Sequence, residues 1–224
     1  MHYDWVVFDA DETLFTFDGK AGLQQLLAQH NVPWHEDHFD DFARVNKPLW
    51  HAFQRGEISA QDIKEQRFVG WDERLGLSSF ELNRRFMSIM AEICEPIDGA
   101  KALLDSLHGK AKMGIITNGF TELQQERLDA HGFNHFFDFI VVSEEEGLAK
   151  PDPAIFHLAE RQHMQHPERE SVLMVGDNLH SDVLGGQRAG WHTCWFQRQP
   201  EPVPEDIIPT LTVSHLSELQ RALV

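Results

Sequence analysis

The chain can be read outward from one stretch near its start, Trp5-Val6-Val7-Phe8-Asp9-Ala10-Asp11-Glu12-Thr13. The apolar run that opens it is rich in β-branched and aromatic side chains, which is typical of a short buried strand. Asp9 and Asp11 follow two positions apart, so their side chains point to the same side of an extended chain. Carboxylates this close repel each other, and their burial is unfavourable unless a cation or hydrogen-bond donors compensate. A divalent metal ion is the simplest compensation, although an exposed acidic loop would produce the same pattern.

The composition limits the classes of partner. The chain has 224 residues, with 36 acidic and 19 basic side chains and a formal net charge of -17. This acidic balance argues against a nucleic-acid polymer or an anionic membrane as the main partner. It does not exclude a small phosphate ester, because a bound Mg²⁺ and a few local cations can reverse the field at one site.

The cysteines and the hydropathy indicate a compartment. Cys94 and Cys194 lie far apart in the sequence and form neither a disulfide framework nor a metal-binding pattern. We interpret them as two thiols in a reducing compartment. No apolar run approaches the roughly 20 residues of a membrane span, and no secretory signal precedes the first strand. We therefore expect a cytoplasmic protein.

A helical pattern fills the chain from about residue 21 to residue 94. Leu23 and Leu27 follow helical spacing, and apolar residues recur at similar intervals through the segment. Ser78-x-x-Glu81 has the form of a capping box ahead of one of these periodic runs. Several amphipathic helices in one block predict a small helical bundle.

Strands and helices alternate in the second half of the chain. We expect strands at 113–116, 139–142, 172–175, 193–196 and 210–213. We expect helices at 100–108, from a capping box at Thr121-x-x-Gln124, from Asp152-Pro153, at 182–189, and from Ser214 or Ser217. This alternation predicts a parallel sheet with helices on both faces, and the helical block is then an insertion after the first strand. Ligands of such sheets lie off the carboxyl ends of the strands.

Four segments at or near these strand ends carry side chains suited to chemistry. They are Asp9–Thr13, Thr117-Asn118-Gly119, Lys150 before Pro151, and Gly176-Asp177-Asn178 with Asp182. Each has an ordinary explanation alone, such as an Asn-Gly turn, a solvated lysine or an aspartate that caps a helix. Their joint occurrence in this order favours a single site.

The four segments read D-x-D-x-T, T-N-G, K-P and G-D-N-x-x-x-D, and their order and spacing resemble the haloacid dehalogenase superfamily. The resemblance implies an α/β fold with a Rossmann-like parallel sheet. In that sheet the first strand would lie between the strands that end at Thr117 and at Asp177. It also implies a catalytic core and an inserted helical cap, formed by residues 1–17 with 95–224 and by residues 18–94.

The resemblance implies a role for each acid. Asp9 would be the nucleophile that attacks phosphorus and forms an aspartyl-phosphate. Asp11 would protonate the leaving alkoxide and then deprotonate the attacking water. Mg²⁺, which Mn²⁺ or Co²⁺ can replace, would be held by the carboxylates of Asp9 and Asp177 and by the main-chain carbonyl of Asp11. Asp182 would be an outer acid or a water-bridged partner of the metal, and the sequence leaves this choice open.

Other motif residues would hold the phosphoryl oxygens. Thr117 and Lys150 would contact them, together with backbone N–H groups near Asn118 and Gly119. Lys150 would also keep the nucleophile ionised. The second acid, Asp11, favours phosphatases and phosphomutases, because the dehalogenases themselves lack it.

Polar side chains at irregular positions of the expected cap are candidates for substrate contact. We predict that Asn46 and Lys47 bind the substrate, with Arg67 as a further candidate. Trp50 or Phe17 would offer an aromatic surface. A competing interpretation places Trp50 in the core of the cap and the two cations on a solvated face.

Three segments narrow the resemblance further. Residues 9–15, 45–50 and 116–120 look like those of bacterial pyrimidine 5′-nucleotidases, a group that hydrolyses UMP, dUMP and dTMP. We therefore expect a Mg²⁺-dependent phosphatase of nucleoside 5′-monophosphates, with a small-molecule phosphomonoester as its partner and a monomeric or small homo-oligomeric state. The alternatives are a sugar-phosphate phosphatase, a phosphomutase, and a non-catalytic binding protein on the same fold.

Overall fold

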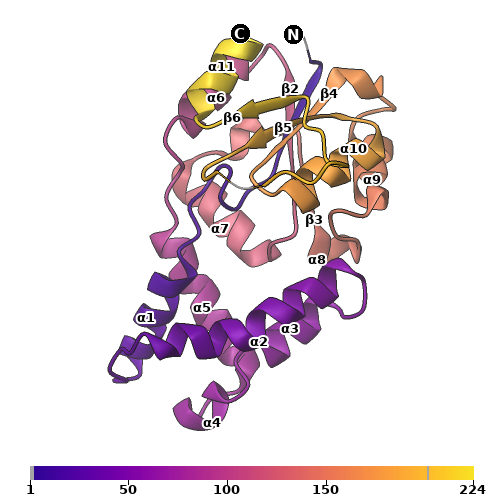
Figure 1. Ribbon diagram of the computed structural model, residues 1–224. Helices are drawn as coiled ribbons and strands as arrows, with labels where there is room; N and C mark the ends of the chain where they lie inside the picture. Colours follow the sequence, from indigo (N-terminus) through magenta and orange to yellow (C-terminus); the bar gives the residue numbers. More distant parts are fainter. Residues whose placement is uncertain (1–2, 201) are drawn as a thin grey trace.

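Two regions make up the computed structural model, which describes residues 3–200 and 202–224 (Figure 1). One is an α/β region built around a sheet. The other is a layer of helices that lies below the sheet in the view of Figure 1. The helices of this second region lie between Gly19 and Ile93, so the chain leaves the sheet after the first strand and returns to it before the second. We call this region the helical layer.

The sheet of the described chain has six strands, all parallel, in the order β3-β2-β1-β4-β5-β6. The strands are β1 (Trp5–Phe8), β2 (Lys112–Thr117), β3 (Phe139–Val142), β4 (Val172–Gly176), β5 (His192–Phe196) and β6 (Leu211–Val213). The first strand is central, because Phe8 lies opposite Ile115 of β2 and Val175 of β4. The predicted parallel sheet, with β1 between β2 and β4, is confirmed.

The helices of the described ranges cover both faces of this sheet and build the helical layer. The α-helices are α1 (Gly19–Gln29), α2 (Asp37–Gln54), α3 (Ala60–Gln66), α4 (Trp71–Leu75), α5 (Ser79–Ile93), α6 (Ala100–Leu107), α7 (Thr121–His131), α8 (Ser143–Glu146), α9 (Pro153–His163), α10 (Gly185–Ala189) and α11 (Leu216–Leu223). Two 3₁₀ helices and one π-helix complete them: η1 (Asn134–Phe136), η2 (Arg169–Ser171) and η3 (Leu179–Leu184). Within the described chain, no helix combines the length and apolarity needed to cross a membrane.

Side chains of β1 alternate between the two apolar cores of the α/β region. Val6 and Phe8 pack in a cluster with residues of α6 and α11. Trp5 and Val7 pack in a second cluster with residues of α9 and α10. This is the two-residue period of a strand that is buried on both faces. Each fully buried apolar side chain contributes roughly 1.5–3 kcal/mol, so β1 is a firm base for the acids that follow it.

The helical layer has an apolar core of its own. Phe42, Phe68 and Phe86 lie with ring centroids 5.0 to 5.7 Å apart. The same cluster includes Phe120 and Leu123 of the α/β region, which follow β2. The predicted helical block is therefore helical, and its core continues onto the end of the sheet where β2 stops.

Two chain segments connect the helical layer to the α/β region, and they pair with each other. The N–H of Thr16 donates to the carbonyl of Glu95 at 2.8 Å, and the N–H of Ile97 donates to the carbonyl of Leu14 at 2.9 Å. The N–H of Glu95 donates in turn to the hydroxyl of Thr16 at 3.1 Å. An antiparallel bridge joins the same segments. We call this paired connection the tether.

The predicted capping box at Thr121-x-x-Gln124 is wrong. Helix α7 begins at Thr121 itself, and Phe120 is its N-cap residue without a side-chain hydrogen bond. The carboxylate of Glu144 accepts the N–H of Thr121 at 3.0 Å and so replaces the missing cap. Gln124 cannot reach back to the helix start, because its side chain binds Arg127.

Three other helix starts agree with the predictions only in part. Ser78 accepts the N–H of Glu81 at 3.2 Å, but the Glu81 carboxylate binds two arginines of α5, so only half of that capping box is present in the described chain. The last helix begins at Leu216, after a Ser214 whose N–H donates to Glu218 at 3.0 Å. The helix expected at 182–189 starts earlier, as the π-helix η3, and continues as α10.

Candidate active site

A cavity of about 430 Å³ lies between the carboxyl ends of the central strands and the helical layer. On the sheet side it is lined by residues of all four sequence motifs, Asp9, Asp11, Thr117, Asn118, Gly119, Lys150 and Asp177. On the other side it is lined mainly by aromatic and apolar residues, Phe39, Phe42, Trp50, Phe86 and Met87. Four segments that are distant in the sequence therefore meet in one place.

Lys150 joins two carboxylates at the base of this cavity. Its Nζ donates to Oδ1 of Asp9 and to Oδ1 of Asp182, both at 2.7 Å. Asp9 reaches this point because it directly follows β1, with its N–H donating to the carbonyl of Val175 at 2.8 Å. Burial alone would lower the pKa of Lys150, but the carboxylates of Asp182 and Asp9 outweigh it and hold that pKa above its ordinary value. The buried lysine is therefore a permanent cation.

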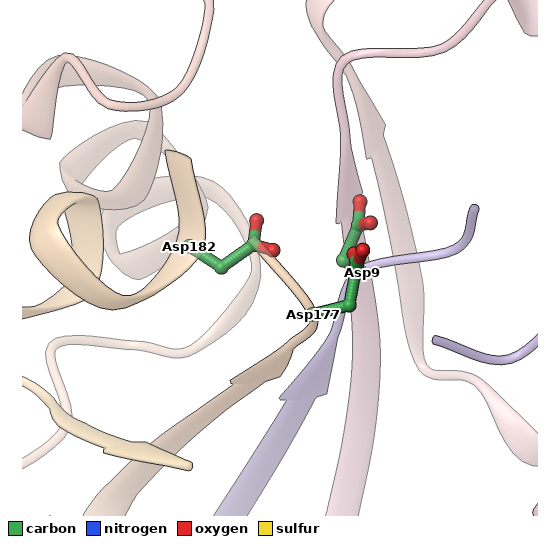
Figure 2. A group of neighbouring side chains, drawn as sticks. All are labelled: Asp9, Asp177 and Asp182. Atoms are coloured by element: carbon green, nitrogen blue, oxygen red, sulfur yellow. The ribbon is translucent and has the colours of Figure 1, made fainter. Parts of the chain in front are cut away.

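The carboxylates of Asp9, Asp177 and Asp182 lie close to one another (Figure 2). Two of them, those of Asp9 and Asp182, accept the hydrogen bonds from Lys150. One oxygen of each of the three lies within 4.8 Å of the other two. Among the described residues, this is the one group of His, Cys, Asp and Glu side chains with spacing suited to a metal ion. A single lysine does not neutralise three carboxylates, and carboxylate oxygens are the ligands that Mg²⁺ prefers. The donor set therefore fits a divalent cation.

Burial and crowding raise the pKa values of two of these acids. Burial raises the pKa of Asp9 to about 7, with Lys150 opposing the rise and Asp182 and Asp11 adding to it. Burial also raises the pKa of Asp177 to about 8, and the carboxylates of Asp182 and Asp9 raise it further. A bound divalent cation favours the charged forms and acts against both shifts.

Asp182 is anchored through both of its oxygens. Oδ1 accepts the Ser181 hydroxyl at 3.1 Å as well as the Lys150 ammonium, and Oδ2 accepts the N–H of Asn178 at 3.0 Å. Gly176 makes room for this arrangement, since a Cβ there would collide with the Asp182 carboxylate. These contacts suit Asp182 to holding Lys150 in place and balancing its charge.

Asp177 is positioned by Thr13 of the first motif and by Trp195. The N–H of Asp177 donates to the Thr13 hydroxyl oxygen at 3.0 Å, and that hydroxyl lies 3.4 Å from Asp177 Oδ1. The indole N–H of Trp195 donates to the main-chain carbonyl of Asp177 at 2.9 Å. The threonine of D-x-D-x-T thus links the first motif to the last.

The side chain of Asn118 clamps the loop that carries Lys150. Its Nδ2 donates to the Lys150 carbonyl at 2.8 Å, and its Oδ1 accepts the Lys150 N–H at 2.9 Å. Asn118 therefore positions Lys150 and has no side-chain atom left that needs a ligand. Thr117 is buried and accepts the N–H of Gly119 at 3.0 Å, which leaves its hydroxyl hydrogen as a donor.

Asp11 has a partner that sequence reasoning missed. Nη1 of Arg127, on α7, donates to Asp11 Oδ1 at 2.6 Å, and Nη2 donates to the side-chain oxygen of Gln124. Arg127 is fully buried, and its guanidinium lies 4.7 Å from the ring centroid of Phe15. A lone arginine inside a helix normally indicates a solvated side chain. Its three-residue spacing from Gln124 was the only signal, and such pairs are common on exposed helix faces.

Helix α2 turns Asn46 and Trp50 toward the cavity and Lys47 away from it. Asn46 and Trp50 lie four residues apart on one helix face, and the Trp50 indole N–H donates to Asn46 Oδ1 at 3.1 Å. Lys47 lies about 100° further round the helix, where it is exposed and outside the cavity lining. The predicted substrate contact of Lys47 does not fit this geometry. Phe17, the other predicted aromatic surface, lines the cavity.

Two cations at the end of α3 are buried rather than solvated. Lys64 forms an ion pair with Glu144 of α8 at 2.5 Å, which connects the helical layer to the α/β region. Arg67 follows α3 and lines the cavity with Asn46 and Trp50. The interpretation of Arg67 as part of a solvated face is therefore wrong.

The model of the haloacid dehalogenase-like hydrolases matches residues 3–190. The chain therefore belongs to the haloacid dehalogenase-like hydrolase family, and it is an enzyme of the hydrolase class. The resemblance that the four motifs carry is confirmed.

Relatives within that family match over most or all of the chain. The chain is 48% identical over 223 residues to the pyrimidine 5′-nucleotidase YjjG of Escherichia coli (strain K12), covering 100% of this chain and 99% of that protein. It is 33% identical over 202 residues to the pyrimidine 5′-nucleotidase PynA of Streptococcus pneumoniae, covering 88% and 84%. The HAD-hydrolase YfnB of Bacillus subtilis, crystallised with magnesium, has a TM-score of 0.85 and 30% identity, with 100% of this chain and 99% of that chain covered.

Proposed function

We propose that the protein is a Mg²⁺-dependent phosphatase that hydrolyses the pyrimidine nucleoside 5′-monophosphates UMP, dUMP and dTMP to nucleoside and phosphate. The observation that carries the proposal is the meeting of Asp9, Asp11, Lys150 and Asp177 in one cavity whose opposite wall is aromatic. Two relatives that are named pyrimidine 5′-nucleotidases support the choice of substrate.

Asp9 acts as the nucleophile in the first step. One of its carboxylate oxygens attacks phosphorus, the new bond makes an aspartyl-phosphate, and the bond between phosphorus and the 5′ oxygen breaks. Lys150 holds Asp9 Oδ1 at 2.7 Å, which fixes the direction of attack. Asp11 gives its proton to the departing 5′ oxygen, so the nucleoside leaves as an alcohol.

Asp11 acts as the base in the second step. It takes a proton from a water molecule whose oxygen attacks the phosphorus of the aspartyl-phosphate, and Asp9 leaves as a carboxylate. Inorganic phosphate is released, and Asp11 is protonated for the next cycle. The bond from Arg127 to Asp11 Oδ1 leaves Oδ2 as the oxygen that exchanges the proton.

The carboxylates of Asp9 and Asp177 and the main-chain carbonyl of Asp11 would hold the Mg²⁺ ion, which Mn²⁺ or Co²⁺ can replace. When bound there, the cation would partly neutralise the negative charge of the phosphoryl group. The magnesium-bound structure of YfnB supports this choice of metal.

The phosphoryl oxygens are held by Lys150, by the Thr117 hydroxyl, and by backbone N–H groups near Asn118 and Gly119. We assign residues 1–17 and 95–224 as the catalytic core and residues 18–94 as a cap that keeps bulk water from the first step. Asn46 contacts the nucleoside from the cap side.

The test is phosphate release with Mg²⁺ from a panel of UMP, dUMP, dTMP, CMP, AMP, GMP and several hexose and triose phosphates. Fast release from the uracil and thymine nucleotides supports the proposal. Fast release mainly from sugar phosphates contradicts the substrate and leaves the chemistry intact. Turnover that requires an added sugar bisphosphate and gives an isomer rather than phosphate identifies a mutase instead.

A further inference from the structure

Arg67 is a buried cation without an anionic partner. Its side chain belongs to a residue that is 2% exposed, and its Nε and Nη2 have no hydrogen-bond partner. Within the described chain, its guanidinium forms neither a hydrogen bond nor an ion pair. The guanidinium lies instead among three rings, 4.9 Å from the centroid of Phe86, 5.2 Å from that of Phe120 and 5.5 Å from that of Phe68.

Such an arrangement is unfavourable in the absence of a ligand. Aromatic faces attract a cation, but they do not replace hydrogen-bond acceptors for its N–H groups. Burial lowers the pKa of Arg67 to about 9, so the group still carries its charge at neutral pH. Buried polar groups without partners are rare in proteins, and a ligand can supply what the chain does not.

The position of Arg67 indicates which part of a ligand it meets. Arg67 lines the same cavity as the motif residues, and it is the one charged side chain that residues 18–94 contribute to that lining. The phosphoryl group already has Lys150 and Thr117 on the sheet side. The ring of Phe120, which touches Arg67, also lies 5.1 Å from the ring centroid of Trp50. Arg67 therefore offers donors at the edge of a region suited to a flat ring.

We propose that Arg67 donates hydrogen bonds to a carbonyl oxygen of the pyrimidine base and thereby selects the substrate. This inference rests on the proposed nucleotidase function. A pyrimidine base is planar, so it can pack against the aromatic wall, and its ring carbonyls are strong acceptors. The base satisfies the buried N–H groups of Arg67, whereas a phosphate ester without a base leaves them unsatisfied. The penalty for that unsatisfied state creates the selectivity.

The test compares UMP with ribose 5-phosphate, which lacks the base. In the Arg67→Met variant, we expect kcat/KM for UMP to fall roughly 10- to 100-fold, as for the loss of a hydrogen bond from a charged group. The value for ribose 5-phosphate should stay nearly unchanged. Equal losses for both substrates would overturn the inference.

Arg74 provides the matched control. It is an exposed arginine of the same helical layer, 4.5 Å from the ring centroid of Trp71, and it does not line the cavity. Arg74→Met should leave kcat/KM unchanged for both UMP and ribose 5-phosphate. The melting temperature of Arg67→Met should not fall below that of the wild type, because the change removes an unpaired buried charge.

The first part of a second measurement uses the wild-type enzyme alone and does not depend on the folding of a variant. The wild-type enzyme is assayed with 2-thio-UMP and 4-thio-UMP, in which sulfur replaces one carbonyl oxygen and is a weaker acceptor. We expect one of these to react roughly tenfold more slowly than UMP, and the deficit to disappear in Arg67→Met. Unimpaired turnover of both analogues contradicts the inference. If the wild-type enzyme does not hydrolyse UMP, both the proposed function and the role of Arg67 are wrong. If the wild-type enzyme hydrolyses UMP but Arg67→Met lowers kcat/KM equally for UMP and ribose 5-phosphate, only the proposed role of Arg67 is wrong.

Discussion

The buried cations on the two sides of the cavity differ in their partners. On the sheet side, Lys150 lies between Asp9 and Asp182, and Arg127 binds Asp11. On the helical side, Arg67 is also buried, but its Nε and Nη2 have no hydrogen-bond partner among the residues that the structure describes. The hydrogen-bond network on the sheet side is therefore complete without a substrate, whereas the helical side holds N–H donors that, in our proposal, the substrate satisfies.

This difference corresponds to two tasks of an enzyme, which are the reaction itself and the choice of substrate. Groups that act on the reacting bond gain from being fixed in advance, because no reorganisation is then needed at the moment of reaction. Groups that choose a substrate gain from being unsatisfied without it, because a wrong substrate then leaves a penalty in place. Groups that act on the reacting bond are therefore expected to be hydrogen-bonded within the chain, whereas groups that choose a substrate are not.

The strongest way to break the sheet side is Asp9→Asn. An amide is not a nucleophile toward phosphorus, so we expect kcat for UMP to fall by about 10⁴-fold or more. Phosphate release under single-turnover conditions measures the effect, and circular dichroism checks that the variant is folded. A folded variant that keeps a tenth of the wild-type rate would remove Asp9 from the role of nucleophile.

The Arg127→Met variant sharpens the comparison by freeing Asp11 from its partner. We expect kcat for UMP to fall roughly 10- to 100-fold, since a misplaced acid protonates the leaving group poorly. The loss should be smaller for p-nitrophenyl phosphate, whose leaving group needs no proton. Arg84→Met is the control, because Arg84 is an exposed arginine that pairs with Glu81 on the same helix. Equal losses for both substrates would show that Arg127 serves stability rather than Asp11.

The pKa values of Asp9 and Asp177 predict how the stability of the metal-free protein depends on pH. Both are raised in the folded state, to about 7 and about 8, so between pH 4 and pH 8 the folded state binds more protons than the unfolded state. The free energy of unfolding should therefore decrease as pH rises through this window. Mg²⁺ competes with those protons and should raise the melting temperature more at pH 8 than at pH 6. Thermal scans with EDTA and with Mg²⁺ at both pH values measure the change in melting temperature. If Mg²⁺ raises the melting temperature equally at the two pH values, or more at pH 6, the result counts against Asp9 and Asp177 as metal ligands.

The smallest expected effect belongs to the ion pair between the helical layer and the α/β region. Glu144→Gln removes the ion pair with Lys64 but keeps an acceptor for the N–H of Thr121. We expect KM for UMP to rise about two- to fivefold with kcat nearly constant, because one contact that holds the helical layer on the sheet is weakened. A double-mutant cycle with Lys64→Met isolates the pair. Independent effects of the two changes would mean that the ion pair does not hold the layer.

The sheet side could be predicted from the sequence because its residues follow strands. Asp9 and Asp177 come one residue after β1 and β4, and Thr117 ends β2. Parallel pairing then brings these ends together whatever the chain does in between. Lys150 alone resembles a solvated lysine, and only its place in the order of motifs pointed to the site.

The remaining contacts could not be predicted, because they arise from tertiary packing. The pair of Asp11 and Arg127 joins residues 116 positions apart, and no local pattern encodes it. The burial of Arg67 depends on how the end of α3 packs against Phe86 and Phe120, which periodicity does not specify. The predicted substrate contact of Lys47 rests on residue type alone. The rotation of α2 about its axis decides which of its side chains face the cavity, and these include Asn46 and Trp50. The packing of α7 likewise gives Gln124 to Arg127 rather than to a capping box.

The tether has a consequence for how such a protein can change over evolutionary time. The chain leaves the sheet near Thr16 and comes back at Glu95, and these two residues are hydrogen-bonded neighbours at 2.8 Å. Whatever lies between them begins and ends at the same point of the fold. One continuous insertion can therefore be lengthened, shortened or replaced while the register of β1 with β2 stays the same. A lineage can acquire new substrates in this way without rebuilding the residues that break the bond.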